Sequence, residues 1–458
     1  MTIAVIEATG AARSLARVVV SSADPKRIRE LSVRLDACGY ATVPVGAGTR
    51  ALRIVREVLP DLVVVNADED IGAAMALAEG VKHCDETRHV PVVMQAMYAD
   101  ATFRRGCLAA GIDDVITGGV SNAILAARLA PLFRLATMTA ELHRRRQTMH
   151  ALGLAEGAKA TIEPDVREPR VLFLNSGLTS PTGSTVELVL AADCGIAHSA
   201  DAFEAAESLS SSQFDALVVV PEDEIERTLH LCAHIRNNPR LFNLPVLIVA
   251  RREQFADVET CYSRGASIVL HRPFDPTELR DHVLSLVRRQ RVRQAIHRGL
   301  SGTLVERTAD AASGLYSKAF SSRHLSRLIS NAGLSQKPVS LVLFDLQNIA
   351  WFERQYGGGS GDRVVNQVSR WIAGLIRAED MAARLGESIV AVILPDTGAH
   401  EAQFVANRIE GVLLNTDFSL KNSVEADPLR VWVGTGIATA EAGDTVDGLI
   451  ARAKSQMR

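Results

Sequence analysis

The sequence predicts an α/β protein built from about three domains. Its 458 residues suffice for that number, and 47% of them are apolar, so each domain can bury a core. Residues 17–132 alternate short apolar runs with helical patterns, and residues 169–288 repeat this alternation. Because strands that alternate with helices indicate βαβ units, we expect a doubly wound parallel sheet in each stretch. The C-terminal part differs, with an amphipathic helix followed by a hairpin pattern.

The charge balance and the cysteines exclude several classes of protein. The net charge is −3 and the pI is about 6.5, which argues against general binding to DNA, RNA or a membrane surface. The N-terminus lacks a basic region followed by an apolar core, and no apolar run is expected to cross a bilayer. Six cysteines without a Cys-x-x-Cys pair indicate reduced thiols in a cytoplasmic protein.

The first module is expected at residues 15–135. Its apolar runs predict strands at Arg17–Ser21, Leu62–Val65, Val90–Met94 and Ile112–Ile116, and helices at Arg27–Cys38 and Ala73–Val81. The segments Leu59-Pro60-Asp61, Arg88–Val93 and Ala110–Asp114 resemble those of response-regulator receiver domains. The resemblance implies a flavodoxin-like fold.

The phosphoryl-transfer chemistry of receiver domains is not supported by this module. That chemistry needs carboxylates for Mg²⁺ and an Asp that accepts the phosphoryl group. Ser22-Ala23 replaces the acidic pair, and Asn66, whose amide is a poor nucleophile, stands at the acceptor position. Asn66 is therefore predicted to be a degenerate phosphoacceptor, with Asp68 or Asp70 as alternative acceptors. We expect a module that is kept for packing and docking.

A linker is expected at residues 136–168, where the apolar strands disappear and Gly and Ala accumulate before Glu163-Pro164. The linker contains the basic run Leu142-His143-Arg144-Arg145-Arg146. Such a run is typical of a solvated helix face or of a nucleic-acid contact. The lack of interleaved aromatic residues favours the solvated face.

The second module, at residues 169–290, repeats the first. Strands are expected at Arg170–Leu174, Ala216–Val220, Val246–Ala250 and Ser267–Leu270. Arg272-Pro273-Phe274 resembles the Lys-Pro-Phe of receiver domains, whereas Asn175-Ser176 and Val220-Pro221 stand where their carboxylates would be. We therefore expect a second receiver-like module that is not phosphorylated.

The third module, at residues 291–458, contains a corner where a helix is followed by a strand. Apolar residues from Val364 to Ile376 recur three and four apart, which predicts an amphipathic helix. The runs Met381–Leu385 and Ile389–Leu394, split by Gly386-Glu387-Ser388, predict a β-hairpin. Arg377 and Asp380 lie three apart at this corner.

These residues resemble the GGDEF domain of diguanylate cyclases. That family has an Arg-x-x-Asp pair, nine residues before the first Gly of its signature turn, that binds the product cyclic di-GMP; here Arg377 lies nine residues before Gly386. The turn itself reads Gly386-Glu387-Ser388-Ile389-Val390, which departs from the signature. The resemblance implies an α/β sandwich with a mainly antiparallel sheet. Together with the first two modules it implies a response regulator with two receiver-like domains before a GGDEF domain.

The resemblance also implies how the active site has changed. Asp345 keeps the family's first Mg²⁺ ligand, but Ser388 and Ile389 occupy the acidic positions of the turn, and Glu387 occupies the second Gly position. We therefore expect a degenerate turn, no bound metal or cofactor, and no enzymatic activity. Around the family's substrate site, Asp362, Lys454 and Arg458 are kept and Glu353 replaces an Asn, so a residual cyclase remains an alternative.

The product site is better kept. A guanidinium fork suits the acceptors O6 and N7 of guanine, and a carboxylate suits its N1 and N2 donors. Arg377, Asp380 and Arg408 are therefore predicted to bind cyclic di-GMP, with Arg327 near the position of a further arginine, which aligns with Asn331. A surface ion pair is the alternative. The function expected is a cyclic di-GMP effector, acting as a homodimer that relays binding to a protein partner, and a ligand-free dimerising scaffold is the other alternative.

Overall fold

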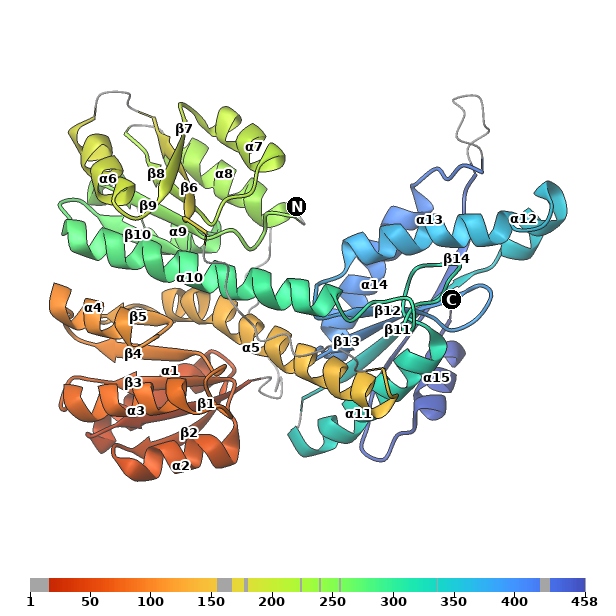
Figure 1. Ribbon diagram of the computed structural model, residues 1–458, viewed down its shortest axis with the longest axis horizontal. Helices are drawn as coiled ribbons and strands as arrows, with labels where there is room; N and C mark the ends of the chain where they lie inside the picture. The colour runs from red at the N-terminus through yellow and green to blue at the C-terminus, as the bar shows by residue number, and fades with distance from the viewer. Residues whose placement is uncertain are drawn as a thin grey trace. The chain divides into compact units, whose positions relative to one another are not determined.

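The computed structural model describes residues 16–154, 167–176, 180–222, 225–238, 240–254, 257–335, 337–420 and 429–457. Residues 155–166 of the expected linker and Arg458 therefore lie outside the described residues. The chain divides into two compact units, Met1–Ala136 with Glu163–Ala295, and Thr137–Ile162 with Ile296–Arg458. The first unit contains two parallel sheets and the second contains one antiparallel sheet (Figure 1).

The first sheet has five parallel strands in the order β2-β1-β3-β4-β5. All five residues of the central strand β3 are buried, as expected for a parallel strand covered on both faces. The order is that of the flavodoxin-like fold. The strands are β1 (Arg17–Ser22), β2 (Ala41–Gly46), β3 (Leu62–Asn66), β4 (Val92–Ala96) and β5 (Asp114–Thr117), and the helices are α1 (Pro25–Ala37), α2 (Thr49–Val58), α3 (Ile71–His83), α4 (Ala101–Ala109) and α5 (Asn122–Ala151).

The second sheet repeats this topology in the order β10-β9-β8-β6-β7. Every residue of β8 and of β9 is buried. The predicted pair of doubly wound parallel sheets is thus confirmed. The strands are β6 (Arg170–Asn175), β7 (Gly195–Ser199), β8 (Ala216–Val220), β9 (Val246–Ala250) and β10 (Ile268–His271), and the helices are α6 (Pro181–Ala191), α7 (Ala202–Ser211), α8 (Ile225–Asn237), the 3₁₀ turn η1 (Arg252–Gln254), α9 (Val258–Ser263) and α10 (Pro276–Ser301).

The third sheet is antiparallel and has the order β12-β13-β11-β14. The central strand β11 pairs with β13 on one side and with β14 on the other. Helices cover both of its faces, which gives the predicted α/β sandwich. The strands are β11 (Val339–Leu346), β12 (Met381–Arg384), β13 (Ile389–Pro395) and β14 (Val433–Thr439), and the helices are α11 (Lys318–Ser335), α12 (Ile349–Tyr356), α13 (Ser360–Leu375), α14 (Ala399–Leu414) and α15 (Val446–Ser455).

Alternate residues of β11 belong to two separate cores. Val342 and Phe344 pack in the core that also contains side chains of α12, α13 and α14. Leu341 and Leu343 pack in the opposite core, with side chains of α11 and α15. This alternation is the period of two that a strand covered on both faces requires. The sheet is therefore fixed in register, and so is the hairpin at its edge.

Helix α5 bears on two expectations and corrects one of them, the solvated basic run. It contains an 18-residue window with a mean hydropathy of 1.3, so by length and composition it could cross a membrane. Half of that window is buried inside the structure, which is usual for a core helix, so the length is weak evidence. The basic run is not a solvated face, because Leu142 is 1% exposed and Arg145 is 3% exposed.

Candidate functional site

The predicted corner lies between α13 and β12. One face of α13 is buried through Val364, Val365, Val368 and Ile372, which fixes the end of the helix against the sheet. Strands β12 and β13 pair antiparallel, with Met381 opposite Ile393 and Arg384 opposite Val390. The predicted hairpin is therefore confirmed. Arg377 and Asp380 occupy the short connection between the helix and the hairpin.

Backbone hydrogen bonds close this connection into a tight turn. The Arg377 N–H donates to the Asp380 carboxylate over 2.8 Å, and the Asp380 N–H donates to the Arg377 carbonyl over 3.1 Å. Asp380 is 5% exposed, whereas the Arg377 side chain lies in solvent. The Arg377 guanidinium makes no hydrogen bond or ion pair with any residue that the structure describes. The two side chains thus do not form the surface ion pair considered as an alternative.

Arg408 approaches the same corner from α14. Its guanidinium donates to the Leu375 carbonyl, the last residue of α13, over 2.7 Å. Burial lowers the pKa of Arg408, the positive charge of Arg377 lowers it further, and Asp380 opposes both effects. The three predicted residues therefore share one electrostatic environment. Two positive groups and one carboxylate are the residue types that an anionic ligand with hydrogen-bonding bases requires.

Arg145 of α5 holds the backbone of this corner through hydrogen bonds, a role that the sequence did not predict. Its Nη2 donates to the backbone carbonyls of Glu379 and Asp380, at 2.9 Å each. Arg145 belongs to the part of α5 that is included in the second compact unit. The one sequence feature that points to a structural role of Arg145 is Glu141, which lies four residues earlier and therefore on the same face of the helix.

Glu141 connects Arg145 to a buried network. Its Oε1 accepts hydrogen bonds from Arg145 Nε over 2.7 Å and from His324 Nε2 over 2.9 Å. Glu141 and His324 are both fully buried. Burial alone would raise the pKa of Glu141, but the charges of His324 and Arg145 outweigh it and hold the pKa at about 2. Arg327, the nearby arginine named from the sequence, donates instead to Gln147 of α5.

The turn Gly386–Val390 connects β12 to β13. The Ser388 hydroxyl donates to the Asp345 carboxylate over 2.6 Å, and the Leu346 N–H donates to the Ser388 carbonyl over 2.9 Å. The Glu387 side chain is exposed, and Ile389 is paired with Asp345 in the sheet. The turn is therefore joined to the end of β11 by a hydroxyl–carboxylate contact.

Arg384 holds the turn and was also missed by the sequence. Its guanidinium donates to the carbonyls of Gly386 and Glu387, at 3.0 Å each, and to the Asp362 carboxylate over 2.8 Å. It also pairs with Asp310 over 3.5 Å. Arg384 thus joins the hairpin to Asp362, which the family resemblance places around the substrate site.

Glu353 has a structural partner as well. Its two carboxylate oxygens accept the backbone N–H groups of Gly359 and Gly361, over 3.0 and 2.8 Å. A Cβ at position 361 would lie 2.8 Å from the Glu353 carboxylate, so a larger residue there would force the carboxylate to shift. The residue that replaces the family's Asn therefore caps the start of α13.

The family implies Mg²⁺, and the residues present fit it in part. Mg²⁺ is usually bound by one or two carboxylates together with waters and substrate phosphates. Asp345 supplies one carboxylate at the end of β11, and Ser388 supplies a hydroxyl beside it. Within the described part of the chain, no group of three His, Cys, Asp or Glu side chains gathers in one place. Asp345 is thus the residue that would hold the ion.

The receiver-like modules show what replaces their phosphorylation chemistry. Asn66 is buried, donates to the carboxylate of Asp68 over 2.9 Å and to Gln95, and accepts from Ser22 over 3.2 Å. Asp70, the other alternative acceptor, instead caps α3 through the Ala73 N–H. Asn66 therefore forms part of a closed network of side chains.

In the second module Arg272 has an anionic partner that the sequence did not predict. Glu222 lies 3.2 Å from the Arg272 guanidinium and also accepts a hydrogen bond from Ser180. Burial acts to raise the pKa of Glu222, but Ser180 and Arg272 together hold it below its ordinary value. The positive charge of Arg272 is thus balanced by the carboxylate of Glu222.

Comparisons with known proteins concern the family of the third module and the architecture of the chain. Residues 307–458 match the family model described as diguanylate cyclase, GGDEF domain. The chain carries a GGDEF domain. The response regulator PleD of Caulobacter vibrioides is 26% identical over 443 residues, which are 96% of this chain and 95% of PleD. With the sheet topology, this similarity confirms the predicted architecture of two receiver-like domains before a GGDEF domain.

Two further similar proteins each match about a third of this chain. The diguanylate cyclase DgcS of Shewanella oneidensis is 28% identical over 138 residues, which are 30% of this chain and 43% of DgcS. The crystal structure of the GGDEF domain of DgcB from Caulobacter crescentus, in complex with c-di-GMP, is 20% identical and covers 33% of this chain and 88% of that one, with a TM-score of 0.31.

These comparisons correct the expectation that the chain is not an enzyme. The matching family is that of diguanylate cyclases, and relatives such as DgcS carry that name. The expectation rested on the sequence Gly386–Val390 alone. A changed turn does not by itself exclude catalysis, because Asp345 remains at the end of β11 and substrate phosphates can complete the coordination of Mg²⁺.

Proposed function

We propose that the GGDEF domain works in cyclic di-GMP signalling and binds cyclic di-GMP at the corner formed by Arg377, Asp380 and Arg408. The observation that carries the proposal is the Arg377 guanidinium, which lies in solvent beside Arg408 and makes no hydrogen bond with the described residues. A guanidinium held there keeps its donor fork available for a ligand, because no protein acceptor has to be displaced.

The chemistry of cyclic di-GMP suits the corner. Its two phosphates are anionic, and Arg408 and Arg377 offer charge-assisted donors to phosphate or to the O6 and N7 edge of guanine. The Asp380 carboxylate accepts a hydrogen bond from the Arg377 N–H, and a carboxylate is the group that suits the N1 and N2 donors of guanine. Arg377, Asp380 and Arg408 are thus the residue types that cyclic di-GMP requires, and the fold places them at one corner.

Calorimetric titration of cyclic di-GMP tests the proposal. The wild type is compared with Arg377→Ala and with the matched control Arg430→Ala, whose side chain is 67% exposed in an ion pair on the same domain. Loss of a bidentate, charge-assisted contact is expected to weaken binding by at least about tenfold in Arg377→Ala. Equal affinity in all three proteins, or no heat in any, would refute the site.

Diguanylate cyclase activity is the second candidate function of this domain. The family match and the names of the relatives favour it. Asp345 would hold Mg²⁺, which activates a 3′-hydroxyl and neutralises a triphosphate when bound. Incubation with GTP and Mg²⁺ tests this, with Asp345→Asn as the inactive control. Product formed by the wild type and not by Asp345→Asn establishes the enzyme, and equal traces from both proteins would refute it.

We further propose that the protein is a homodimer, and that ligand binding alters a surface to which a protein partner binds. A change of the backbone at Asp380 would reach α5 through Arg145, which donates to the Glu379 and Asp380 carbonyls. The melting temperature with and without guanine nucleotides tests the scaffold alternative. No shift with cyclic di-GMP or GTP would leave a ligand-free scaffold.

A further inference from the structure

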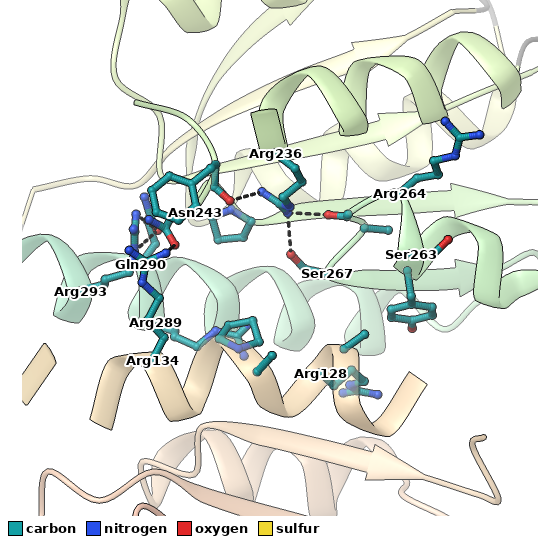
Figure 2. A pocket seen from close by; sticks show the side chains of 18 of the residues that line it. Arg128, Arg134, Arg236, Asn243, Ser263, Arg264, Ser267, Arg289, Gln290 and Arg293 are labelled. Atoms are coloured by element: carbon teal, nitrogen blue, oxygen red, sulfur yellow. Dashed lines mark hydrogen bonds between the residues drawn. The ribbon is translucent and has the colours of Figure 1, made fainter. Parts of the chain in front are cut away.

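The first compact unit contains a cavity of about 820 Å³. Its walls come from α5, α8 and α10 and from the segment between α9 and β10 (Figure 2). This volume is in the range of pockets that hold small molecules. The cavity plays no part in the chemistry described above, and its lining residues all belong to the first unit.

The lining is strongly positive. Asp114 is the one carboxylate among the described lining residues. Six arginines contribute to the lining: Arg128, Arg134, Arg236, Arg264, Arg289 and Arg293. Asp114 is already neutralised, because Arg128 donates to its two oxygens over 2.6 and 3.0 Å. The chain as a whole carries a net charge of −3, so this accumulation of positive charge is local. Like charges around one partly buried space repel unless an anion separates them.

Some of these arginines have structural partners, whereas the side chains of Arg264, which is exposed, and Arg289 have none among the described residues. Arg236 donates to the carbonyls of Phe242 and Leu244, at 2.8 Å each, and so holds a loop in place. Arg289 on α10 makes no hydrogen bond or ion pair with any residue described in the structure. Burial lowers the pKa of Arg289, and the carboxylates of Asp114 and Asp113 oppose this lowering. A partly buried guanidinium without an acceptor lowers the stability of the folded protein, so Arg289 is expected to destabilise the first unit.

Part of the remaining wall is apolar and aromatic. The Arg134 guanidinium lies over the Phe242 ring at 4.2 Å, and the Tyr262 ring and Pro131 also line the space. Flat apolar surfaces beside donor forks suit a molecule that has an aromatic base at one end and phosphates at the other. We propose that this cavity binds a nucleotide that carries two or more phosphoryl groups.

Arg289→Gln separates this proposal from a structural role. Removing an unpaired guanidinium is expected to leave the melting temperature unchanged or to raise it, because no protein contact is lost. The same change removes a charge-assisted donor, so the affinity for a nucleotide is expected to fall about tenfold or more. Arg53→Gln is the control for charge, since Arg53 is 68% exposed on α2 in a surface ion pair.

The probes are ATP, GTP and inorganic tripolyphosphate, titrated calorimetrically into the full chain. ATP matters most, because the GGDEF domain is proposed to take guanine ligands. The proposal expects ATP or GTP to bind more tightly than tripolyphosphate, with affinity lost in Arg289→Gln and kept in Arg53→Gln. No binding of either nucleotide, an equal loss in both variants, or tripolyphosphate binding as tightly as both nucleotides would overturn it.

A measurement on the unmodified protein gives an independent check. Phenylglyoxal modifies accessible arginines, and peptide mass spectrometry locates each modified residue. Saturating ATP or GTP is expected to protect Arg289 and Arg293 and to leave Arg53 reactive. Unchanged modification of Arg289 and Arg293 at saturation would place the nucleotide elsewhere and overturn the proposal.

Discussion

Arginines of the GGDEF domain show how contacts, and not residue type, decide what a side chain is available to do. The Arg384 guanidinium is fully engaged with the Gly386 and Glu387 carbonyls and with Asp362, so it holds the turn. The Arg377 guanidinium, seven positions earlier, makes no such contact among the described residues and stays available for a ligand. Both residues look alike in the sequence. Their roles differ because only Arg384 lies within a strand whose turn folds back over it.

Ser388 offers a residue-scale test of the metal site. Its hydroxyl lies 2.6 Å from Asp345, so Ser388→Asp places a second carboxylate beside the first. Two carboxylates at that distance repel, which is expected to lower the melting temperature without metal. Mg²⁺ would bridge them, so the variant is expected to show a larger Mg²⁺-dependent rise in melting temperature than the wild type.

Ser388→Asn is the matched control for this substitution, because it changes the size of the side chain without adding charge. Thermal unfolding without Mg²⁺ and at increasing Mg²⁺ concentrations up to saturation provides the readout. An equal Mg²⁺ response in Ser388→Asp and Ser388→Asn would show that Asp345 and residue 388 do not share an ion.

At the scale of elements, the sequence predicted the strands that form apolar runs, including β5 and β10 at the edges of the two parallel sheets, and missed the edge strands β2 and β7. Strands such as β3 and β8 are apolar throughout because helices cover both faces, so their runs stand out. The edge strands β2 and β7 are mostly exposed or half-buried and mix polar residues with apolar ones, so no run marked them. Pro44 within β2 further weakened the pattern, since proline is tolerated only at such an edge.

The candidate site was predictable where it depended on local spacing. Arg377, Asp380 and the hairpin follow from residues close in sequence, and Arg408 follows from a family register. Arg145 did not follow, because its partners at Glu379 and Asp380 are more than 230 positions away. The basic run around it was read as solvated because nothing local shows that Glu141 and His324 are buried with it.

Glu141 predicts how the second unit responds to acid. Its pKa is about 2 in the folded protein against an ordinary value of 4.5. A lowered folded pKa means that Glu141 stabilises the fold fully above about pH 4.5 and that this contribution is lost as the pH falls towards 2. Glu141→Gln is expected to destabilise the unit at neutral pH by about 3–5 kcal/mol, because Arg145 and His324 lose their buried anion.

The same substitution should flatten the dependence of unfolding free energy on pH between 4.5 and 2, since the titrating group is gone. Urea unfolding at several pH values provides the measurement. Glu306→Gln is the control, because Glu306 is exposed and forms no ion pair with a described residue. If Glu141→Gln kept the acid slope of the wild type, the slope would belong to other carboxylates.

At the scale of the whole molecule, two helices have residues in both compact units. The boundaries fall after Ala136 within α5 and after Ala295 within α10, so neither helix belongs to one unit alone. Each unit nevertheless has its own buried cores. Chains of this kind commonly unfold in more than one step, because each core can be lost separately. The two proposed ligand sites lie in different units, cyclic di-GMP in the second and the phosphorylated nucleotide in the first.

Scanning calorimetry with each ligand in turn follows from this division. A ligand at about 100 times its dissociation constant adds about 2.7 kcal/mol to the state that binds it, which corresponds to roughly 5–10 °C for a domain of ordinary size. Cyclic di-GMP is expected to raise one transition and ATP the other, with Arg377→Ala removing the first shift and Arg289→Gln the second. A ligand that raised both transitions equally would contradict independent units. The free energy of binding would then be shared along α5 and α10, the segments that continue from one unit into the other.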